Sequence, residues 1–447
     1  MERTQRCIHC MLGTISGGRC THCGKTAAEA GARPEHALPP HYMLCQNRYY
    51  IGNVLGNGGF GITYLAWDCK NRRRVAVKEL FPKQAVSRAD ISRVLTMTDK
   101  QAYFQHVKRR FCEEAQILYG LRNIPEVIDV YHLFEENGTA YYVMEYLEGR
   151  DLKRSLARDG KMKWEQIKDP LRMILRALYV LHSKNLIHRD ITPDNIFLTK
   201  GRGAKLLDFG SARSYIDSQH LTVLLKRQFA PYEQFAENGK QGPWTDIFSL
   251  SVTLYYALSG VLPPTATDRI FAMRSQPPYK DPVKPIEELC PDLPENVSHA
   301  VHKGMEVMAG QRYQTVQEFS DQLFPGMDIL SGYSKRIKKQ TTDMRTGQAT
   351  TIKCKKGIFF GKNQELHPGI TITIGRETDC QVQYPSNSRG ISRRQCSFTM
   401  DNKKIVYVRD ENSTYGTFVD GERLSPMDWH PVKSGNKISF AQEEYYL

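Results

Sequence analysis

Two short stretches determine how this chain is interpreted: IHRDITPDN at residues 187–195 and LDFG at residues 207–210. The first places Asp190 five positions before Asn195, and the second adds Asp208. Phosphoryl transfer from ATP needs one carboxylate that orients the attacking hydroxyl, together with an Asn and an Asp that hold metal ions against the phosphates. His-Arg-Asp alone is common by chance, but the two stretches at this spacing predict such a site.

These stretches resemble the catalytic loop and the metal-binding segment of protein kinases. The resemblance implies a bilobal kinase fold, with ATP as the phosphate donor and Mg²⁺ or Mn²⁺ as the metal. It assigns Asp190 as the residue that orients the hydroxyl, and Asn195 and Asp208 as metal ligands. One position departs from the family, because Thr192 stands where most Ser/Thr kinases have Lys. The ammonium group that would steady the transferred phosphate is therefore missing.

A Gly-rich segment precedes these stretches. Strand-like residues 49–55 run directly into Gly56, Gly58 and Gly61, which have the G-x-G-x-x-G spacing. Dinucleotide-binding folds use the same spacing, but there a helix follows the glycines, whereas here the pattern of a second strand follows. We therefore interpret the glycines as a hairpin that closes over phosphates, with Lys78 pairing with their charge.

Lys78 needs a carboxylate to position it. Apolar residues recur at near-helical spacing from position 103 to 118 and predict a helix that carries Glu113 and Glu114. By resemblance to the family, Glu114 is the ion-pair partner of Lys78 and Glu113 is its solvated neighbour. The segment 82–100 is long for a connection, and is interpreted as either a regulatory insert or a loop.

Residues 140–144 have the pattern of a buried strand and lead into an expected hinge at 145–147. In kinases the backbone of the hinge reads the adenine. Asp151 lies just beyond, either at the ribose or at the N-cap of a helix. The resemblance assigns eleven residues to ATP: Leu55, Gly56, Gly58, Gly61, Thr63, Ala76, Lys78, Met144, Glu145, Leu147 and Asp151.

The region after the metal-binding segment resembles the part of protein kinases that docks a peptide. There Asp246 is expected to fix the backbone of the catalytic loop, and Arg312 to pair with Glu233. Small-molecule kinases lack this region, so the resemblance implies a protein substrate and Ser/Thr specificity. Residues 211–230 would form the activation segment, with Ser214, Ser218 and Thr222 as candidate phosphorylation sites.

Four of the eleven cysteines lie within the first 23 residues. They form two C-x-x-C knuckles, Cys7 with Cys10 and Cys20 with Cys23, which can present four thiolates tetrahedrally to zinc. Metal binding would supply the folding energy that so short a segment cannot obtain from a core. The pattern resembles a miniature zinc ribbon and predicts structural zinc. A redox pair or free thiols are the alternatives, and His9 or His22 as a substitute ligand is a minor variant.

The end of the chain changes to short alternating strands, which predict a β-sandwich. It contains IGR at 374–376, ISRR at 391–394 and NSTYGTFVDG at 412–421. This order resembles a forkhead-associated domain, which captures phosphothreonine with loops at one end of a sandwich. Arginine and hydroxyl groups suit a phosphate dianion. The resemblance assigns four residues to the phosphopeptide: Arg376, Ser392, Arg393 and Thr414.

Two residues of this segment depart from the forkhead-associated pattern. Gln395 replaces the scaffold His, and Tyr415 replaces the Asn that holds the backbone of the ligand. A sandwich whose pocket is altered or inactive is therefore the alternative interpretation.

The whole chain of 447 residues has a formal charge of +14 and a pI near 9.2. Such a charge favours acidic partners, but Lys and Arg are scattered, so we interpret it as a solvated basic surface. Basic residues do not interleave with aromatic ones, and nucleic acid is not expected as a partner.

No apolar run approaches the roughly 20 residues of a membrane helix, and residues 1–25 lack the apolar core of a secretion signal. We expect a cytoplasmic protein without a membrane partner.

The sequence thus predicts a multidomain α+β chain. Its expected parts are a zinc ribbon at 1–26, a linker at 27–48, a protein kinase domain at 49–325, a basic linker at 326–351 and an all-β forkhead-associated domain at 352–447.

The expected function is that of a bacterial Ser/Thr protein kinase of the non-specific type, which phosphorylates proteins and itself. It would read phosphothreonine in a partner protein or in its own phosphorylated segments, at Thr222, Thr341, Thr342 or Thr346. The alternative, kept open by Thr192, Gln395 and Tyr415, is a catalytically weak pseudokinase scaffold that binds nucleotide and phosphoprotein partners.

Overall fold

The computed structural model contains two compact units, Met1–Leu330 (unit 1) and Ser331–Leu447 (unit 2), and each is described by itself. The described residues are 6–30, 33–90, 92–122, 124–201, 203–209, 213–214, 227–236, 239–275, 280–330, 350–359, 361, 363–366, 371–377, 380–401 and 405–447. Among them, no helix combines the length and the apolar character that crossing a membrane requires.

Unit 1 begins with a small module built around the four N-terminal cysteines. A hairpin of β1 (Ile15–Ser16) and β2 (Arg19–Cys20) is followed by a 3-10 turn at Ala27–Ala30. Gly13 packs so closely in this module that a Cβ atom there would lie 2.6 Å from the Cys20 Sγ. Tight turns around the sulfur atoms therefore shape this module.

The strand-rich lobe of unit 1 (residues 33–145) is an antiparallel sheet in the order β3-β4-β5-β6-β10-β9. Its strands are β3 (Met43–Leu44), β4 (Tyr49–Asn57), β5 (Gly61–Asp68), β6 (Arg73–Leu80), β9 (Val130–Glu136) and β10 (Thr139–Glu145). Residues 33–48, which the sequence suggests as part of a linker, contribute β3, and Leu38 and Leu44 are fully buried. The segment 82–100 forms a hairpin of β7 (Val86–Arg88) and β8 (Val94–Thr96) followed by a 3-10 turn.

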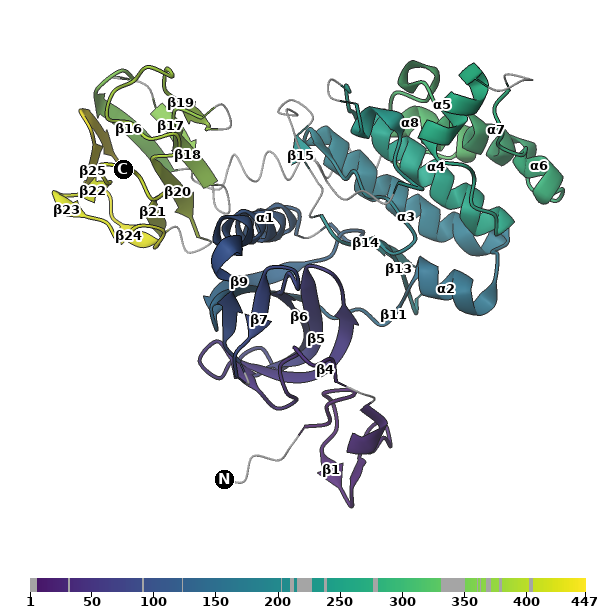
Figure 1. Ribbon diagram of the computed structural model, residues 1–447, viewed down its shortest axis with the longest axis horizontal. Helices are drawn as coiled ribbons and strands as arrows, with labels where there is room; N and C mark the ends of the chain where they lie inside the picture. The colour runs from purple at the N-terminus through teal and green to yellow at the C-terminus, as the bar shows by residue number, and fades with distance from the viewer. Residues whose placement is uncertain are drawn as a thin grey trace. The chain divides into compact units, whose positions relative to one another are not determined.

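One long helix, α1 (Gln101–Gly120), packs on this sheet (Figure 1). Its buried residues include Phe104, Phe111 and Leu118, which agrees with the apolar periodicity of the sequence. The ring of Phe111 lies 4.8 Å from the ring of Tyr142 on β10. This packing places the helix that carries Glu114 beside the strands that carry Lys78.

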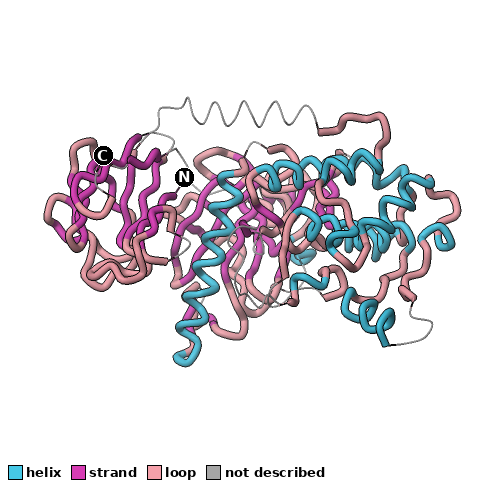
Figure 2. Tube along the Cα trace, turned by 90° about the horizontal axis from the view of Figure 1, so that it is seen from above, coloured by secondary structure: helices cyan, strands magenta, loops and turns pink. Residues whose placement is uncertain are grey.

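The helix-rich lobe of unit 1 (residues 149–330) holds small sheets and most of the helices, a separation visible in Figure 2. Its strands are β11 (Gly149–Asp151), β13 (Ile196–Thr199) and β14 (Ala204–Leu206) in one sheet, and β12 (Leu186–Ile187) with β15 (Arg213–Ser214) in another. Its helices are α2 (Leu152–Asp159), α3 (Trp164–Ser183), α4 (Pro243–Ser259), α5 (Ala266–Ser275), α6 (Ile286–Leu289), α7 (Glu295–Gly304) and α8 (Val316–Leu323).

Helix α4 is the centre of this lobe because it is buried nearly all round. Pro243 at its first position and Gly260 in the left-handed conformation after its last residue are the usual start and stop signals of a helix. A helix that is apolar on every side belongs in a core. Its first turn carries Asp246, so a charged residue is carried into the interior with it.

Unit 2 is a sandwich of two sheets, ordered β17-β16-β26-β25-β22-β23 and β19-β18-β20-β21-β24. The strands are β16 (Thr350–Lys356), β17 (Asn363–Leu366), β18 (Thr371–Gly375), β19 (Val382–Gln383), β20 (Cys396–Met400), β21 (Val406–Asp410), β22 (Phe418–Val419), β23 (Glu422–Arg423), β24 (His430–Val432), β25 (Lys437–Phe440) and β26 (Glu443–Tyr446). Alternate residues such as Ile372, Phe398 and Ile438 point inward and form one apolar core. The β-sandwich expected from the alternating pattern is confirmed.

Candidate active site and phosphate pocket

The Gly-rich turn joins β4 to β5. The Gly58 N–H donates to the Gly61 carbonyl at 2.9 Å, which closes the turn. A Cβ at Gly61 would lie 2.5 Å from the Glu79 carbonyl, so only glycine fits there, whereas Gly56 has open space around it. Open space above a backbone is what a phosphate chain needs for close approach.

Strand register places the residues expected around ATP in one part of the sheet. Thr63 on β5 lies opposite Lys78 on β6, and Ala76 on β6 lies opposite Met144 on β10. Leu55 and Leu147 are half-buried on the segments before the turn and after β10.

Two residues expected around ATP have their side chains engaged elsewhere. The Glu145 carboxylate accepts from the Asp129 N–H at 2.9 Å and also contacts Lys205 Nζ. The Asp151 carboxylate accepts from the Arg154 N–H at 2.7 Å, as the N-cap of α2. Of the two roles considered for Asp151, the N-cap is therefore the one seen.

Lys78 lies at the centre of a charged cluster. Its Nζ is 3.0 Å from Glu114 Oε1 and 3.9 Å from Asp208 Oδ2. The Tyr142 hydroxyl donates to the same Glu114 oxygen at 2.8 Å. Burial opposes the charge of Lys78, but the carboxylates of Asp208 and Glu114 outweigh it and raise the Lys78 pKa well above its ordinary value. Lys78 is therefore held as a cation where phosphates would bind.

The neighbouring acid on α1, Glu113, faces another way. Its carboxylate lies 3.8 Å from Arg109 Nε, one turn earlier on the helix, and its side chain is 36% exposed. The half-buried Glu113 and the buried Glu114 match the pairing inferred by resemblance.

The catalytic loop holds Asn195 against Asp190. The Asn195 Nδ2 group donates to the Asp190 carbonyl at 2.8 Å and to Asp190 Oδ2 at 2.7 Å. With its N–H₂ group used in this way, the Asn195 side chain offers its oxygen as a ligand. The Leu207 N–H donates to the Asn195 carbonyl at 2.8 Å and brings the segment of Asp208 alongside. Oxygen atoms of an amide and a carboxylate are the donor set that Mg²⁺ prefers.

Asp246 holds the backbone of that loop. Its carboxylate accepts three hydrogen bonds at 2.8 Å, from the His188 N–H, the Arg189 N–H and His182 Nε2. Burial alone would raise the Asp246 pKa, but the hydrogen bond from His182 and those from the loop lower it below the ordinary value. Arg189 adopts a φ of 68°, in the left-handed region, and the bond from its N–H to Asp246 helps to hold it there.

A second buried ion pair anchors the end of the segment that follows. Arg312 donates to both oxygens of Glu233, at 2.7 and 3.0 Å. Both residues are nearly inaccessible to solvent. The Gln234 side-chain amide donates to the Arg189 carbonyl at 3.0 Å and links this region to the catalytic loop.

Several residues singled out in the sequence lie outside the described part of the chain. They are Gly210, Ser218, Thr222, Thr341, Thr342, Thr346 and the side chain of Ser214.

The four N-terminal thiols converge. All four sulfur atoms lie within 4.8 Å of one another, and Cys7–Cys23 and Cys10–Cys20 are 3.7 and 3.6 Å apart. Thiolates about 2.3 Å from a tetrahedral zinc lie about 3.8 Å from one another, so the spacing fits zinc. The thiols differ in acidity: burial raises the pKa of Cys7 to about 12, whereas N–H groups of Cys23 and His22 outweigh burial and lower the pKa of Cys20 to about 6.

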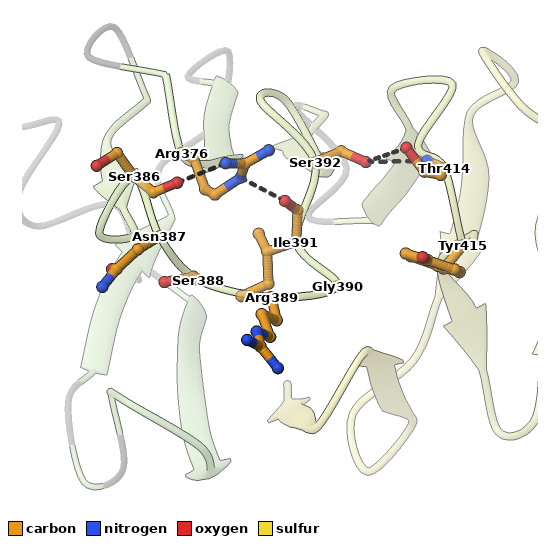
Figure 3. A pocket seen from close by; sticks show the side chains of 10 residues that line it. All are labelled: Arg376, Ser386, Asn387, Ser388, Arg389, Gly390, Ile391, Ser392, Thr414 and Tyr415. Carbon is orange, nitrogen blue, oxygen red and sulfur yellow. Dashed lines mark hydrogen bonds between the residues drawn. The ribbon is translucent and has the colours of Figure 1, made fainter.

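Loops at one end of unit 2 enclose a polar cavity of about 250 Å³ (Figure 3). Arg376 crosses its wall, where Nε donates to the Ile391 carbonyl at 2.6 Å and Nη1 donates to the Ser386 carbonyl at 2.5 Å. The Ser392 hydroxyl accepts from the Thr414 N–H at 2.9 Å and lies 3.3 Å from the Thr414 hydroxyl. Arg376, Ser392 and Thr414, which the sequence motifs suggest, thus line the cavity together. Arg393 does not line it, and its side chain is exposed.

The sequence motifs miss part of this cavity. Residues 386–390 form one wall, and Arg389 contributes a second guanidinium group to the lining. The Ser388 Oγ is buried without a protein partner. The only signal was composition, because the stretch SNSRG combines hydroxyl, amide, basic and glycine residues as anion-binding loops do.

Gln395, which replaces the scaffold His of the family, is fully buried below this cavity. Its Oε1 accepts from the Ser392 N–H at 3.0 Å. Its Nε2 donates to the Ser413 hydroxyl at 2.8 Å and to the Gly416 carbonyl at 3.1 Å. The amide therefore joins the loop of Ser392 to the loop of Thr414. Tyr415, the other departure, is 65% exposed at the rim of the cavity.

Comparison with known families matches both parts of the chain. A model of the protein kinase domain matches residues 49–315, and a model of the FHA domain matches residues 372–441. A solved structure described as PpkA-294 in its apo form has a TM-score of 0.56 and 30% identity, and the match covers 64% of this chain and 99% of that chain.

Two bacterial relatives show the extent of the similarity. The serine/threonine-protein kinase PknB of Mycobacterium leprae is 33% identical over 316 residues, which are 68% of this chain and 46% of that protein. The serine/threonine-protein kinase PknA of a Nostoc species is 34% identical over 233 residues, which are 49% of this chain and 38% of that protein. The chain spans less than half the length of these relatives.

Replacing Asp246 with Asn should destabilise unit 1. The variant loses the charge and presents an N–H₂ group toward backbone N–H donors. We expect the free energy of unfolding to fall by about 3 kcal/mol at neutral pH. A carboxylate whose folded-state pKa is lowered stabilises the fold above the unfolded pKa of about 3.9, and this contribution is lost as the pH falls through the folded pKa. The difference in unfolding free energy between the wild type and the variant, measured by urea unfolding, should therefore become smaller below about pH 4.

Asp99→Asn is the matched control, because the Asp99 side chain is 73% exposed. It should leave the stability nearly unchanged over the same pH range. Equal pH dependence for wild type and Asp246→Asn would contradict a stabilising role for the buried charge.

Replacing Gln395 with Ala should loosen the cavity of unit 2. The substitution leaves buried hydrogen-bonding groups without partners, and the unfolding free energy of unit 2 should fall by about 2–3 kcal/mol. Gln383→Ala, on the exposed side of β19, should be neutral. Denaturant unfolding of the full chain, followed through the transition of unit 2, measures both, and an equal effect of the two variants would refute the bridging role.

Proposed function

Because the chain belongs to the bacterial Ser/Thr protein kinases of the Hanks type and carries a C-terminal forkhead-associated domain, we propose that it transfers the γ-phosphate of ATP to Ser and Thr hydroxyl groups of proteins. The observation that carries the proposal is the charged cluster of Lys78, Glu114 and Asp208, beside Asn195 and Asp190. This arrangement combines a fixed cation, two metal ligands and a carboxylate for the incoming hydroxyl.

Each residue has a distinct task in this proposal. Lys78, held by Glu114, neutralises phosphate charge, and Asn195 and Asp208 offer oxygen ligands to a divalent metal. The metal, when bound, neutralises charge that develops on the phosphates. Asp190 accepts the proton of the attacking hydroxyl, and its orientation is set by the Asn195 amide and, through the loop backbone, by Asp246.

Thr192 does not favour the alternative function, a pseudokinase scaffold. Its side chain is buried, and its carbonyl accepts from the Asn195 N–H at 2.9 Å, within the loop that presents Asp190. An uncharged side chain at position 192 therefore fits into this loop. No observation favours a nucleotide-binding scaffold over catalysis.

For unit 2 we propose binding of phosphothreonine, in a partner protein or in a phosphorylated segment of this chain. The support is a cavity whose lining includes the guanidinium-bearing Arg376 and Arg389 and the hydroxyl-bearing Ser392 and Thr414. Charge-assisted hydrogen bonds of this type are the strong ones in phosphate recognition.

For the N-terminal module we propose a structural zinc ion bound by Cys7, Cys10, Cys20 and Cys23, which leaves no open coordination position. A thiol-rich site of this type belongs in a reducing compartment, so we place the protein in the cytoplasm.

Asp190→Asn should lower phosphoryl transfer by a factor of about 10²–10⁴ without loss of ATP binding, because the hydroxyl loses its proton acceptor. Transfer of labelled phosphate from ATP to the protein itself and to a general protein substrate measures the rate. Asp194→Asn is the matched control, since that carboxylate pairs with Lys153 Nζ at 3.0 Å. ATP binding without any transfer in the wild type would support the scaffold instead.

Arg376→Ala should weaken binding of a phosphothreonine peptide about tenfold or more, because a charged hydrogen bond is lost. The exposed Arg393 lies outside the cavity lining, so Arg393→Ala should have a smaller effect. Titration calorimetry with phosphorylated and unphosphorylated forms of one peptide measures both. Equal binding of the two peptides by the wild type would contradict phosphothreonine recognition.

A further inference from the structure

The cysteine module lies against the first long strand of the strand-rich lobe, β4, within the same compact unit (Figure 1). The Asn53 N–H donates to the Ile8 carbonyl at 3.1 Å. The Asn53 side-chain amide lies 3.0 Å from His9 Nδ1, and His9 Nε2 lies 2.8 Å from the Thr26 carbonyl. His9 therefore accepts from Asn53 through one nitrogen and donates to Thr26 through the other. Ile8 and His9 both lie between Cys7 and Cys10, so the contacts come from inside the first knuckle.

Strand β4 is irregular at this point. Its pairing with β5 runs from Ile51 opposite Ala66 to Val54 opposite Tyr64, with a register shift between them. Residues 52–53 form the bulge, and a bulge leaves an N–H group outside the ladder. The Ile8 carbonyl accepts a hydrogen bond from the Asn53 N–H, which has no partner in the β4–β5 ladder at this bulge. Asn53 is half-buried, and an N–H group shielded from water without an acceptor would be unfavourable by about 1–3 kcal/mol. The bulge supplies the donor and the module supplies the acceptor.

Gly52 allows the close approach. A Cβ atom at position 52 would lie 2.2 Å from Met11 Cε and 2.7 Å from the Ile8 carbonyl oxygen. The methionine side chain could move away, but the carbonyl could not move without losing the Asn53 N–H. Met11 is itself fully buried. The strand thus carries a glycine where the module approaches its backbone closely.

A cation–π contact extends this interface to the next strand. The Arg6 guanidinium lies 3.8 Å from the ring centre of Trp67 on β5, and its Nη1 donates to the Met11 carbonyl at 3.1 Å. The module is therefore fixed to both strands that flank the Gly-rich turn.

We propose that the zinc-bound module is a clamp that holds β4 and thereby the Gly-rich turn in the geometry for nucleotide binding, so that loss of the metal weakens ATP binding. Leu55 and Gly56 follow the clamped bulge within three residues on the same strand. The proposal rests on the proposed use of ATP and adds a partner for that site within the chain. The four thiolates fix the knuckle, the knuckle presents the Ile8 carbonyl and His9, and these fix the bulge.

The first experiment compares the full chain before and after zinc removal by a chelator, with magnesium restored by dialysis. Zinc removal should weaken binding of a fluorescent ATP analogue about fivefold or more. It should also speed hydrogen exchange at the Asn53 amide. If zinc removal changes neither the affinity for the ATP analogue nor the exchange rate of the Asn53 amide, the clamp is refuted but the proposed kinase function is not. A wild type that carries no zinc would have the same consequence. A zinc-loaded wild type that binds no ATP would overturn the proposed function and the coupling with it.

The second experiment breaks the contact and keeps the metal. Gly52→Ala should retain one zinc, exchange its Asn53 amide faster and bind ATP more weakly. Gly310→Ala is the matched control, because nothing lies within 4 Å of a Cβ atom at that position. Asn53→Ala, which removes only the contact with His9, should act in the same direction but less strongly. A Gly52→Ala protein with wild-type exchange and affinity would show that the module is a passive appendage.

Discussion

The buried carboxylate of Asp246 is the constraint on which the catalytic loop depends. A charge inside a protein is unfavourable unless hydrogen bonds replace its water shell. Here the replacements are two backbone N–H groups of the loop and the ring of His182. The position in the first turn of α4 also favours a negative charge. Because the loop must donate to Asp246, its backbone cannot relax, and Arg189 stays in a left-handed conformation. The orientation of Asp190 follows from this fixed backbone.

The two regions proposed to bind phosphate satisfy their buried polar groups in different ways. In unit 1 the charges of the half-buried Lys78 and the buried Glu114 stabilise each other, so the position of α1 against the sheet determines whether Lys78 remains a well-placed cation. In unit 2 the corresponding central group is the neutral amide of Gln395, with donors and acceptors satisfied on both sides. An amide does not titrate, whereas a histidine would change charge near pH 6.5. The cavity of unit 2 therefore keeps its internal hydrogen bonds regardless of pH in the neutral range.

The sequence predicted best what is encoded locally. The apolar stripe of α1, the Gly-rich hairpin and the clustered motif residues could all be read from spacing. Short strands such as β23 and β24 could not, because two or three residues become a strand only through their partners. The role of Asp151 remained ambiguous for a similar reason, since only the neighbouring Arg154 N–H decides it. Arg389 and Ser388 were missed because no periodic pattern marks a loop that folds over a cavity.

The cysteine module, which the sequence separates from the kinase domain by a linker, packs directly on strand β4. A segment of this size cannot bury a core of its own, so it packs on the surface of a neighbour and would be stabilised further by a bound metal. The neighbouring strand in turn contains a bulge whose N–H group needs an acceptor outside the sheet. A glycine inside a strand pattern is a recognised sign of such an irregularity. Gly52 therefore already marks, in the sequence, where the backbone of a second element approaches. Since each part supplies what the other lacks, the module and the lobe contact each other directly within one compact unit.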